Sequence, residues 1–336
     1  MPGRAEGSVN RGGPAPPARS SPSLKHPAVA FAAHSKGVDP VLPENPARSS
    51  FGALTGTSVP LHIVDVGANP IDGTPPYAPL LASGNATVLG FEPNPAALDR
   101  LQAMKGPRET YLPHAIGDGG QHTLHVCAAP GMTSLLRPNP AVLGLFHGFP
   151  DWGRVVEEIP VATMRLDDIP EARGADMLKI DIQGGELMAM RHAESLLRDL
   201  LVIQTEVEFL PLYADQPLYA DVEQHLRARG FVLHRFFPTV SRVIAPMLVN
   251  NNIYEGMSQL VWADAIFVRD FTRPELFSDR QLLAAATILH DCYGSLDLVL
   301  HLLTEHDRRT GGARAPGYLG SLRALGAAPV PEALAA

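Results

Sequence analysis

Two short polar motifs, each at the end of an apolar run, hold the residues best suited to chemistry. Asp65-Val-Gly67-Ala-Asn69 follows an apolar run that begins at Leu61, and Glu92 follows a second run over residues 87–91. In nucleoside-binding folds, the turn after the first strand holds one end of the ligand, and an acid after the second strand accepts hydrogen bonds from the ribose hydroxyls. The order of these motifs therefore predicts a nucleoside site.

Three prolines indicate which nucleoside this site binds. We expect a helix over residues 75–83, with Thr74 at its N-cap and Pro75 at its first position. Pro75, Pro76 and Pro79 have no backbone N–H, whereas a dinucleotide fold uses the N–H groups of this helix end to hold a pyrophosphate. The Gly-x-Gly-x-x-Gly spacing of dinucleotide sites is also absent. Because S-adenosylmethionine carries a ribose and an adenine but no phosphate, the sequence favours it over NAD.

Five residues are candidates for holding this cofactor. Glu92 ends an apolar strand, and we expect its carboxylate to accept both ribose hydroxyls. Gly67 would let the backbone approach the ligand, and Asn69 would bind the methionine carboxylate or cap the turn. Asp65 would contact the α-ammonium group or the loop that holds it, or would only cap the turn. Asp118 would face the adenine amino group, or would form an Asx turn.

A second polar group lies within Leu178-Lys-Ile-Asp-Ile-Gln183. Strand alternation puts Lys179, Asp181 and Gln183 on one face. Charged residues inside a central strand are costly unless paired, so an ion pair between Lys179 and an acid is one interpretation. The other depends on position, because Asp181 ends the strand at the edge where open α/β sheets bind ligands, and could accept a substrate proton there. Glu206, at the end of the next apolar run, is the second candidate for that role.

Alternating strand and helix patterns must position these groups. Apolar runs predict strands, and a 3.6-residue periodicity predicts helices. We expect strands over residues 61–67, 87–91, 111–116, 122–127, 158–165, 176–182, 200–206, 231–236 and 260–268, and helices over residues 75–83, 95–105, 186–198, 222–229, 276–290 and 296–306. Strands that alternate with helices favour a parallel α/β sheet with right-handed crossovers, and the last two strands are expected as an antiparallel pair at its edge.

Four stretches fall outside this alternating pattern. Residues 1–58 are rich in Pro, Gly, Ser and Ala and predict a disordered leader, and residues 310–336 predict a flexible tail. Residues 273–309 predict a helical appendage, which is a candidate element for a homodimer. The loop over residues 128–156 is long enough to be functional, and its apolar side chains either close over a bound substrate or pack on the sheet edge.

Composition and charge exclude several classes of function. The formal net charge of −8 argues against bulk binding to nucleic acid. No apolar run reaches the length of a membrane span, no signal peptide is visible, and the two distant cysteines fit free thiols, so we expect a cytoplasmic protein. The histidines show no metal-ligand grouping, and Asp167 and Asp168 are adjacent rather than clustered, so no metal site is expected.

In this order, the motifs resemble the FkbM family of S-adenosylmethionine-dependent methyltransferases. The similarity extends from about residue 61 to residue 270 and rests on Val64-Asp-Val-Gly-Ala-Asn69, Phe91-Glu-Pro-Asn-Pro95, Ala115-Ile-Gly-Asp118, Met132-Thr-Ser-Leu135, Leu166-Asp-Asp168 and Leu178-Lys-Ile-Asp-Ile-Gln-Gly-Gly-Glu186. The family usually has a glycine soon after the Asn of the first motif, where this chain has Pro70-Ile71-Asp72, and often has Glu in place of Gln183. The resemblance implies a Rossmann-like class I methyltransferase sheet of about seven strands, in a domain over residues 59–272.

The resulting hypothesis is O-methylation of a hydroxyl on a glycan or a secondary metabolite. An alcohol is a weak nucleophile at neutral pH, so a general base is expected, with Asp181 as the first candidate and Glu206 as the second. Two alternatives stay open. One is a nicotinamide-dependent oxidoreductase with a divergent turn, and the other is a non-catalytic scaffold that keeps the cofactor pocket and presents the 128–156 loop to a partner.

Overall fold

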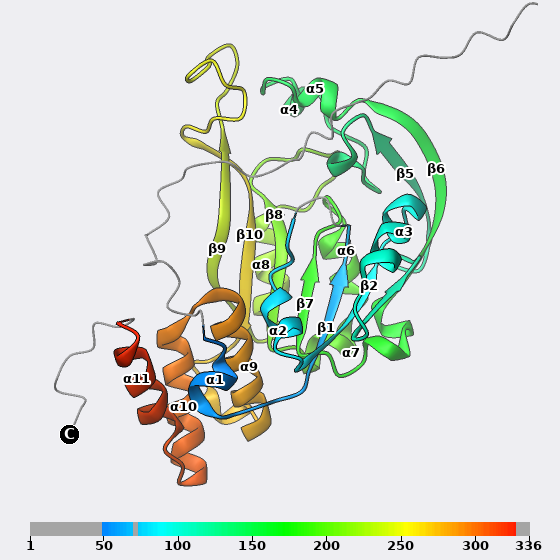
Figure 1. The fold of residues 1–336 in the computed structure, drawn as a ribbon. Helices are drawn as coiled ribbons and strands as arrows, with labels where there is room; N and C mark the ends of the chain where they lie inside the picture. The colour runs from blue at the N-terminus through cyan, green and yellow to red at the C-terminus, as the bar shows by residue number, and fades with distance from the viewer. Residues whose placement is uncertain (1–48, 70–72, 327–336) are drawn as a thin grey trace, which may run out of the picture. The chain divides into compact units, whose positions relative to one another are not determined.

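A seven-stranded sheet forms the centre of the computed structural model, which describes residues 49–69 and 73–326 (Figure 1). Its order is β3 (Glu109–Leu112), β2 (Ala86–Phe91), β1 (Leu61–Val66), β7 (Met177–Ile180), β8 (Val202–Glu208), β10 (Gln259–Arg269) and β9 (Phe231–Arg242). All neighbours are parallel except β10, which is antiparallel to both β8 and β9. The α/β sheet and its antiparallel edge pair are therefore as predicted. Residues 1–48 of the predicted leader lie outside the described residues, and disorder is wrong for residues 51–55, which form a helix with a buried Phe51.

The chain changes direction across the sheet between β1 and β7. β1 is followed by β2 and β3 on one side, and β7 is followed by β8 on the other. The carboxyl ends of β1 and β7 therefore meet at a topological switch point, where open α/β sheets bind ligands. The register pairs Asp65 with Lys179 across these two strands. Both strands are almost entirely buried, which explains their nearly continuous apolar sequences.

Helices cover both faces of the sheet and enclose two apolar cores. They are α1 (Phe51–Thr55), α2 (Ala78–Ala82), α3 (Pro95–Met104), α6 (Glu186–Arg191), α7 (Glu194–Asp199), α8 (Tyr219–Arg227) and three C-terminal helices. Ile63 and Val268 pack with α1, α2 and the C-terminal helices, whereas Val64 and Phe267 pack with α6, α7 and α8. Neighbouring residues of one strand thus belong to different cores, as strand geometry requires. No helix in the described part of the chain is long and apolar enough to cross a membrane.

A smaller sheet is formed by the part of the chain between β3 and β7. Its order is β4 (Ala115–Ile116), β6 (Val155–Met164) and β5 (Gln121–Cys127), and helices α4 (Pro140–Leu143) and α5 (Phe149–Trp152) lie between β5 and β6 in sequence. The antiparallel pairing of β5 with β6 confirms the two predicted arms. The strand predicted over residues 111–116 is divided between the two sheets, because Pro113 has no N–H to continue a ladder.

Two predicted helices differ from those in the structure. The helix expected from Pro75 begins only at Ala78, and Tyr77 takes the N-cap position in place of Thr74. The cause is local, because a residue that precedes a proline disfavours helical backbone, and Pro75 precedes Pro76. The helix expected over residues 186–198 is divided into α6 and α7.

The C-terminal helices are α9 (Asp279–Tyr293), α10 (Leu296–Thr310) and α11 (Arg314–Ala324). Buried side chains of all three share one apolar cluster with the sheet. The flexible tail predicted from residue 310 is wrong for residues 314–324, because α11 buries Ala315, Tyr318 and Leu322. A hydrogen bond of 2.8 Å joins the Tyr318 hydroxyl to Nδ1 of the buried His290. A homodimer through these helices stays a prediction, and the faces described here cover the chain's own sheet.

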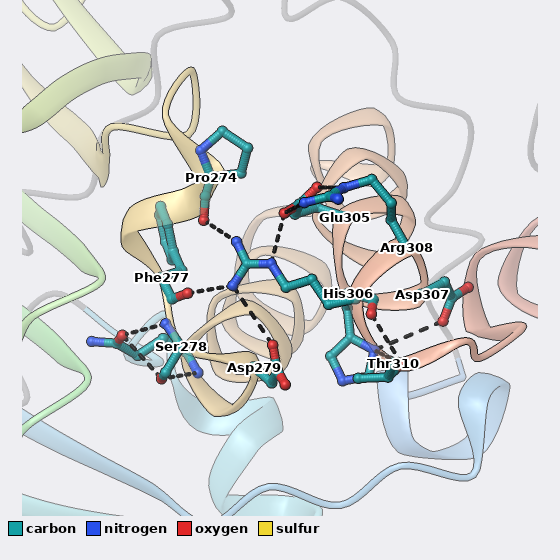
Figure 2. Close-up of polar contacts among 11 residues, drawn as sticks. Pro274, Phe277, Ser278, Asp279, Glu305, His306, Asp307, Arg308 and Thr310 are labelled. Atoms are coloured by element: carbon teal, nitrogen blue, oxygen red, sulfur yellow. Dashed lines mark hydrogen bonds and ion pairs between the residues drawn. The ribbon is translucent and has the colours of Figure 1, made fainter.

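One guanidinium group ties the start of α9 to the end of α10. Arg309 donates to the backbone carbonyls of Pro274 and Phe277 and to the Glu305 carboxylate, each at 2.6 Å. Arg308 binds the same Glu305 carboxylate, and Figure 2 shows this contact. The planar fork of an arginine can satisfy several acceptors at once. This contact therefore fixes the segment before α9 against the two helices.

Tyr318→Ala should lower the free energy of unfolding by about 3–5 kcal/mol, as for other large buried aromatic side chains. The ring is 0% exposed, and its hydroxyl is paired with His290. Urea denaturation followed by circular dichroism measures the change. Leu325→Ala, just beyond the same helix and 48% exposed, is the control and should change the value by less than about 0.5 kcal/mol. An equally small effect of Tyr318→Ala would contradict the packing of α11.

Candidate functional site

A cavity of about 710 Å³ lies at the carboxyl ends of β1, β2, β7 and β8. Residues of the turns after β1 and β2 line one side, and acids that follow β7 or end β8 line the other. Residues 130–135, after β5, and Phe149 of α5 also line it. This volume is within the usual range of ligand pockets, about 300–1,000 Å³. The cavity is therefore the candidate active site.

The turn after β1 comes close to the end of β7 at Gly67. Gly67 has a φ of +80°, in the left-handed region, and a Cβ there would lie 2.0 Å from the Asp181 carbonyl oxygen. Only glycine fits such a position. The Gly67 N–H donates to the Phe91 carbonyl at 3.1 Å, which ties the turn to β2 as well. One residue thus joins the cofactor side of the cavity to its acidic side.

Two polar side chains on the cofactor side can bind hydroxyl and amino groups. Glu92 is 4% exposed, and its Oε1 accepts the Asn94 N–H at 2.7 Å. Burial raises the pKa of Glu92, while that N–H and the Lys179 charge oppose the rise. The buried Oδ1 of Asn69 has no hydrogen-bond partner among the described residues, so it can accept from a ligand. The predicted cofactor residues Gly67, Asn69 and Glu92 therefore line one cavity.

Asp65 contacts side chains of the protein and is not among the described residues that line this cavity. Its Oδ2 accepts from the Tyr77 hydroxyl at 2.5 Å, and its Oδ1 lies 3.4 Å from Lys179 Nζ. Burial and the Asp65 carboxylate raise the pKa of Tyr77, which keeps that hydroxyl a donor. Lys179 donates to the Gly67 carbonyl at 3.0 Å. Of the roles considered for Asp65, these contacts favour holding the turn, and they give Lys179 an acid partner on β1.

Asp118 also lies outside the described lining of the cavity. Its Oδ1 accepts from His122 Nε2 at 2.8 Å, from the Gly120 N–H at 2.7 Å and from the Thr163 hydroxyl at 3.2 Å. The His122 bond, followed by the Gly120 N–H, holds the pKa of Asp118 at about 2. This geometry is the turn that was the alternative for Asp118, and its contact with adenine stays a prediction. His114, earlier in the same stretch, does line the cavity.

Gln183 joins the two candidate bases. Its side-chain nitrogen donates to Asp181 Oδ1 at 3.0 Å and to Glu206 Oε2 at 2.7 Å. Its side-chain oxygen accepts from the buried Tyr213 hydroxyl at 3.0 Å. The structure therefore brings Asp181 and Glu206 together, as their positions at strand ends predict, while their role as bases stays a prediction. No site role was predicted from the sequence for Gln183 or Tyr213.

Two further acids flank this pair. Glu186 is 2% exposed and Glu208 is 3% exposed. Burial raises the pKa of Glu186 to about 7, and burial together with neighbouring acids raises the pKa values of Glu206 and Glu208 well above their usual range. Carboxylate oxygens of Asp181, Glu186 and Glu206 lie within 4.8 Å of one another, a spacing compatible with a cation. The absence of a metal, which the sequence predicts, stays a prediction.

The antiparallel strand β10 supplies two lining residues that sequence reasoning missed. Asp264 lies opposite Glu206 in the register of β10 and β8, and Trp262 lies opposite Glu208. Both line the cavity. Asp264 could have been noticed in the sequence as a single acid at the end of the apolar run Leu260-Val-Trp-Ala-Asp264. Only the pairing of β10 with β8, however, shows that this acid lies beside Glu206 at the cavity.

The segment over residues 128–156 both packs and lines the cavity. Leu143, Phe146 and Phe149 are buried in an apolar cluster with Tyr213. Leu145 is 45% exposed, so not all of its apolar side chains contribute to that cluster. These contacts agree with the packing role, and closure over a bound substrate stays a prediction.

A family model for the methyltransferase FkbM domain matches residues 65–233, just over half of the chain. No curated protein matches the chain. A precorrin-6y C5,15-methyltransferase from Geobacter metallireducens GS-15 is 14% identical, over 65% of this chain and 84% of that one, with a TM-score of 0.31. Human methyltransferase-like protein 13 in complex with SAH is 12% identical, over 75% and 87%, with a TM-score of 0.30. M. jannaschii TYW2 in complex with AdoMet is 13% identical, over 64% and 72%, with a TM-score of 0.29.

Glu92→Ala should weaken binding of S-adenosylmethionine by at least about tenfold, because a hydrogen bond to a charged group contributes about 1.5–3 kcal/mol. Isothermal titration calorimetry measures the affinity. Glu92→Gln keeps an acceptor for the Asn94 N–H, and so separates loss of the ligand contact from loss of that bond. Asp99→Asn, on the exposed face of α3, is the control. Unchanged affinity in a folded Glu92→Ala protein would exclude Glu92 from the ribose contact.

Proposed function

We propose a reaction and a substrate class for this chain, which belongs to the FkbM family of S-adenosylmethionine-dependent methyltransferases. The reaction is methylation of a hydroxyl group, and the acceptor is a glycan or a secondary metabolite. One observation carries the proposal: a single cavity has cofactor-side residues at one end and two linked carboxylates at the other. Carboxylates accept hydrogen bonds from hydroxyls, so the acidic end suits an acceptor that carries them.

The residues after β1 and β2 fit S-adenosylmethionine, which supplies a methyl group on a positively charged sulfur. Glu92 has one oxygen engaged by the Asn94 N–H and can offer the other to ribose hydroxyls. The side-chain N–H groups of Asn69 would bind the methionine carboxylate, as predicted, and its buried Oδ1, which lacks a partner among the described residues, would accept from the amino group of the methionine part. Gly67 lets the turn pack directly against the Asp181 carbonyl, where a Cβ would not fit. Asp65 and Lys179 would hold this turn in shape.

Asp181 is the first candidate for the general base, and Glu206 is the second. Both carboxylates line the cavity, and each has one oxygen bound by the Gln183 amide. Burial raises the pKa of Glu206 well above its usual range, so this group holds its proton more tightly near neutral pH. Asp181 stays the first candidate because of its position directly after β7, at the edge of the sheet where open α/β folds bind ligands.

Apolar side chains around the acids would keep water out of the reaction. They include Met132, Leu212, Phe149 and Trp262. A dry cavity strengthens the electrostatic interaction between a carboxylate and a hydroxyl proton, because less solvent competes for either group. The same walls would bind the less polar part of an acceptor.

The function can be tested by a search for a methylated product. Purified protein is incubated with cell extract and with S-adenosylmethionine labelled on its methyl group, and products are compared by mass spectrometry. We expect one compound to gain a single labelled methyl group, located on oxygen by fragmentation, with no gain when Glu92→Ala replaces the wild type. A label on nitrogen or carbon would contradict O-methylation. Cofactor binding without any labelled product would favour the scaffold.

Asp181→Asn should lower turnover on that compound by about 10²–10⁴-fold, the usual effect of losing a general base. The affinity for S-adenosylmethionine should change little, because the asparagine keeps the shape of the side chain. Asp176→Asn is the matched control: Asp176 is 3% exposed just before β7, and it pairs with Arg280 at 2.6 Å, away from the cavity. It should lower stability more than turnover. A folded Asp181→Asn enzyme with near-normal turnover would move the assignment to Glu206.

A further inference from the structure

Gln183 lies between two carboxylates that could not easily both be charged without it. Oxygens of Asp181 and Glu206 lie within 4.8 Å of each other, in a group that also includes Glu186. Buried carboxyl groups this close usually share a proton, because two neighbouring negative charges in a poorly solvated site repel each other. The Gln183 amide has two N–H hydrogens and donates one to each acid, at 3.0 Å and 2.7 Å. Its hydrogens therefore take the position that a shared proton would otherwise fill.

The amide is held in this orientation from several directions. The Tyr213 hydroxyl donates to Gln183 Oε1 at 3.0 Å, which leaves the amide nitrogen facing the carboxylates. The Ser134 hydroxyl donates to the Gln183 backbone carbonyl at 2.6 Å. Gln183 also has a φ of +57°, a conformation that few residues other than glycine adopt. The backbone thus accepts an uncommon geometry that aims this side chain between the two acids.

The elements around the Gln183 side chain carry several acids and few basic groups that could neutralise them. Lys179 lies in β7 and Asp181 follows it, Glu186 begins α6, Glu206 and Glu208 end β8, Asp264 lies in β10, and Tyr213 follows β8. None of the described residues that line the cavity of about 710 Å³ is a lysine or an arginine. Lys179 is engaged with Asp65 and with the Gly67 carbonyl. The N–H groups of Gln183 are therefore close positive partners for the candidate bases within the cavity.

We propose that Gln183 is a positioning residue for methyl transfer, which holds Asp181 and Glu206 in place and lowers the free-energy cost of a negative charge on either carboxyl group. It binds one oxygen of each carboxylate and leaves Asp181 Oδ2 and Glu206 Oε1 for the proton of the acceptor. This role rests on the proposed function, since the two acids are its candidate bases. The hydrogen bonds themselves, however, can be tested without an acceptor.

The test is a carboxyl titration by ¹³C NMR of the full chain, with labelled Asp and Glu side chains. Gln183→Met keeps the length of the side chain but removes both donors. Loss of a donor destabilises the charged form of a carboxyl group, so the titration midpoints of Asp181 and Glu206 should rise by about 1–2 pH units. Tyr213→Phe, which releases the amide oxygen, should raise them by a smaller amount. Methyl transfer to an identified acceptor would then need a correspondingly higher pH.

Gln204→Met is the matched control. Gln204 donates to Asp264 at 2.6 Å and accepts from Tyr293 at 2.9 Å, so it repeats the same contacts beside a different acid. Its loss should raise the midpoint of Asp264 but not those of Asp181 and Glu206. Unchanged midpoints in folded Gln183→Met and Tyr213→Phe proteins, or an equal rise in Gln204→Met, would overturn the proposal. Calorimetry with S-adenosylmethionine reports separately on the proposed function, because its failure in the wild type would leave the titration result intact.

Discussion

The close approach of β1 and β7 at their carboxyl ends is the constraint on which the site depends. The space that a side chain at Gly67 would need is filled by the carbonyl of Asp181, and the pair of Asp65 with Lys179 holds the same two strands together. A cofactor bound at the first turn is therefore next to the acid that follows β7. Any residue larger than glycine would separate these strands, and with them the two halves of the cavity.

The acidic end of the cavity opposes stability. Glu186, Glu206 and Glu208 all have raised pKa values because burial disfavours their charged forms. A buried arginine would neutralise such acids, but it would also occupy the oxygens that a substrate needs. An amide or hydroxyl group can instead donate a hydrogen bond to a carboxylate, which stabilises its negative charge without forming a strong ion pair. This explains why a neutral glutamine and a tyrosine lie where electrostatics alone would favour a cation.

Much of this architecture could be predicted from local sequence pattern. Glu92, Asp181 and Glu206 lie at strand ends because apolar runs mark the strands, and parallel strands bring their carboxyl ends to one edge. The contacts of Gln183 and Asp264 could not be predicted, because they depend on pairing between segments far apart in the sequence. Helix α11 was missed for a different reason. Pro316 and two glycines obscure its pattern, and only its burial against His290 shows that it belongs to the core.

The packing of α1 against the C-terminal helices has a consequence for synthesis on the ribosome. The Phe51 N–H donates to Asp291 at 2.7 Å, and the Phe51 ring lies 6.2 Å from that of Tyr318, so the first and last described helices meet (Figure 1). All seven strands of the main sheet are translated before α9, α10 and α11 exist to cover one of its faces. At usual rates of elongation, that apolar face stays uncovered for a few seconds. The last helix, rather than the last strand, completes the core, and the nascent chain must be kept from aggregating until it arrives.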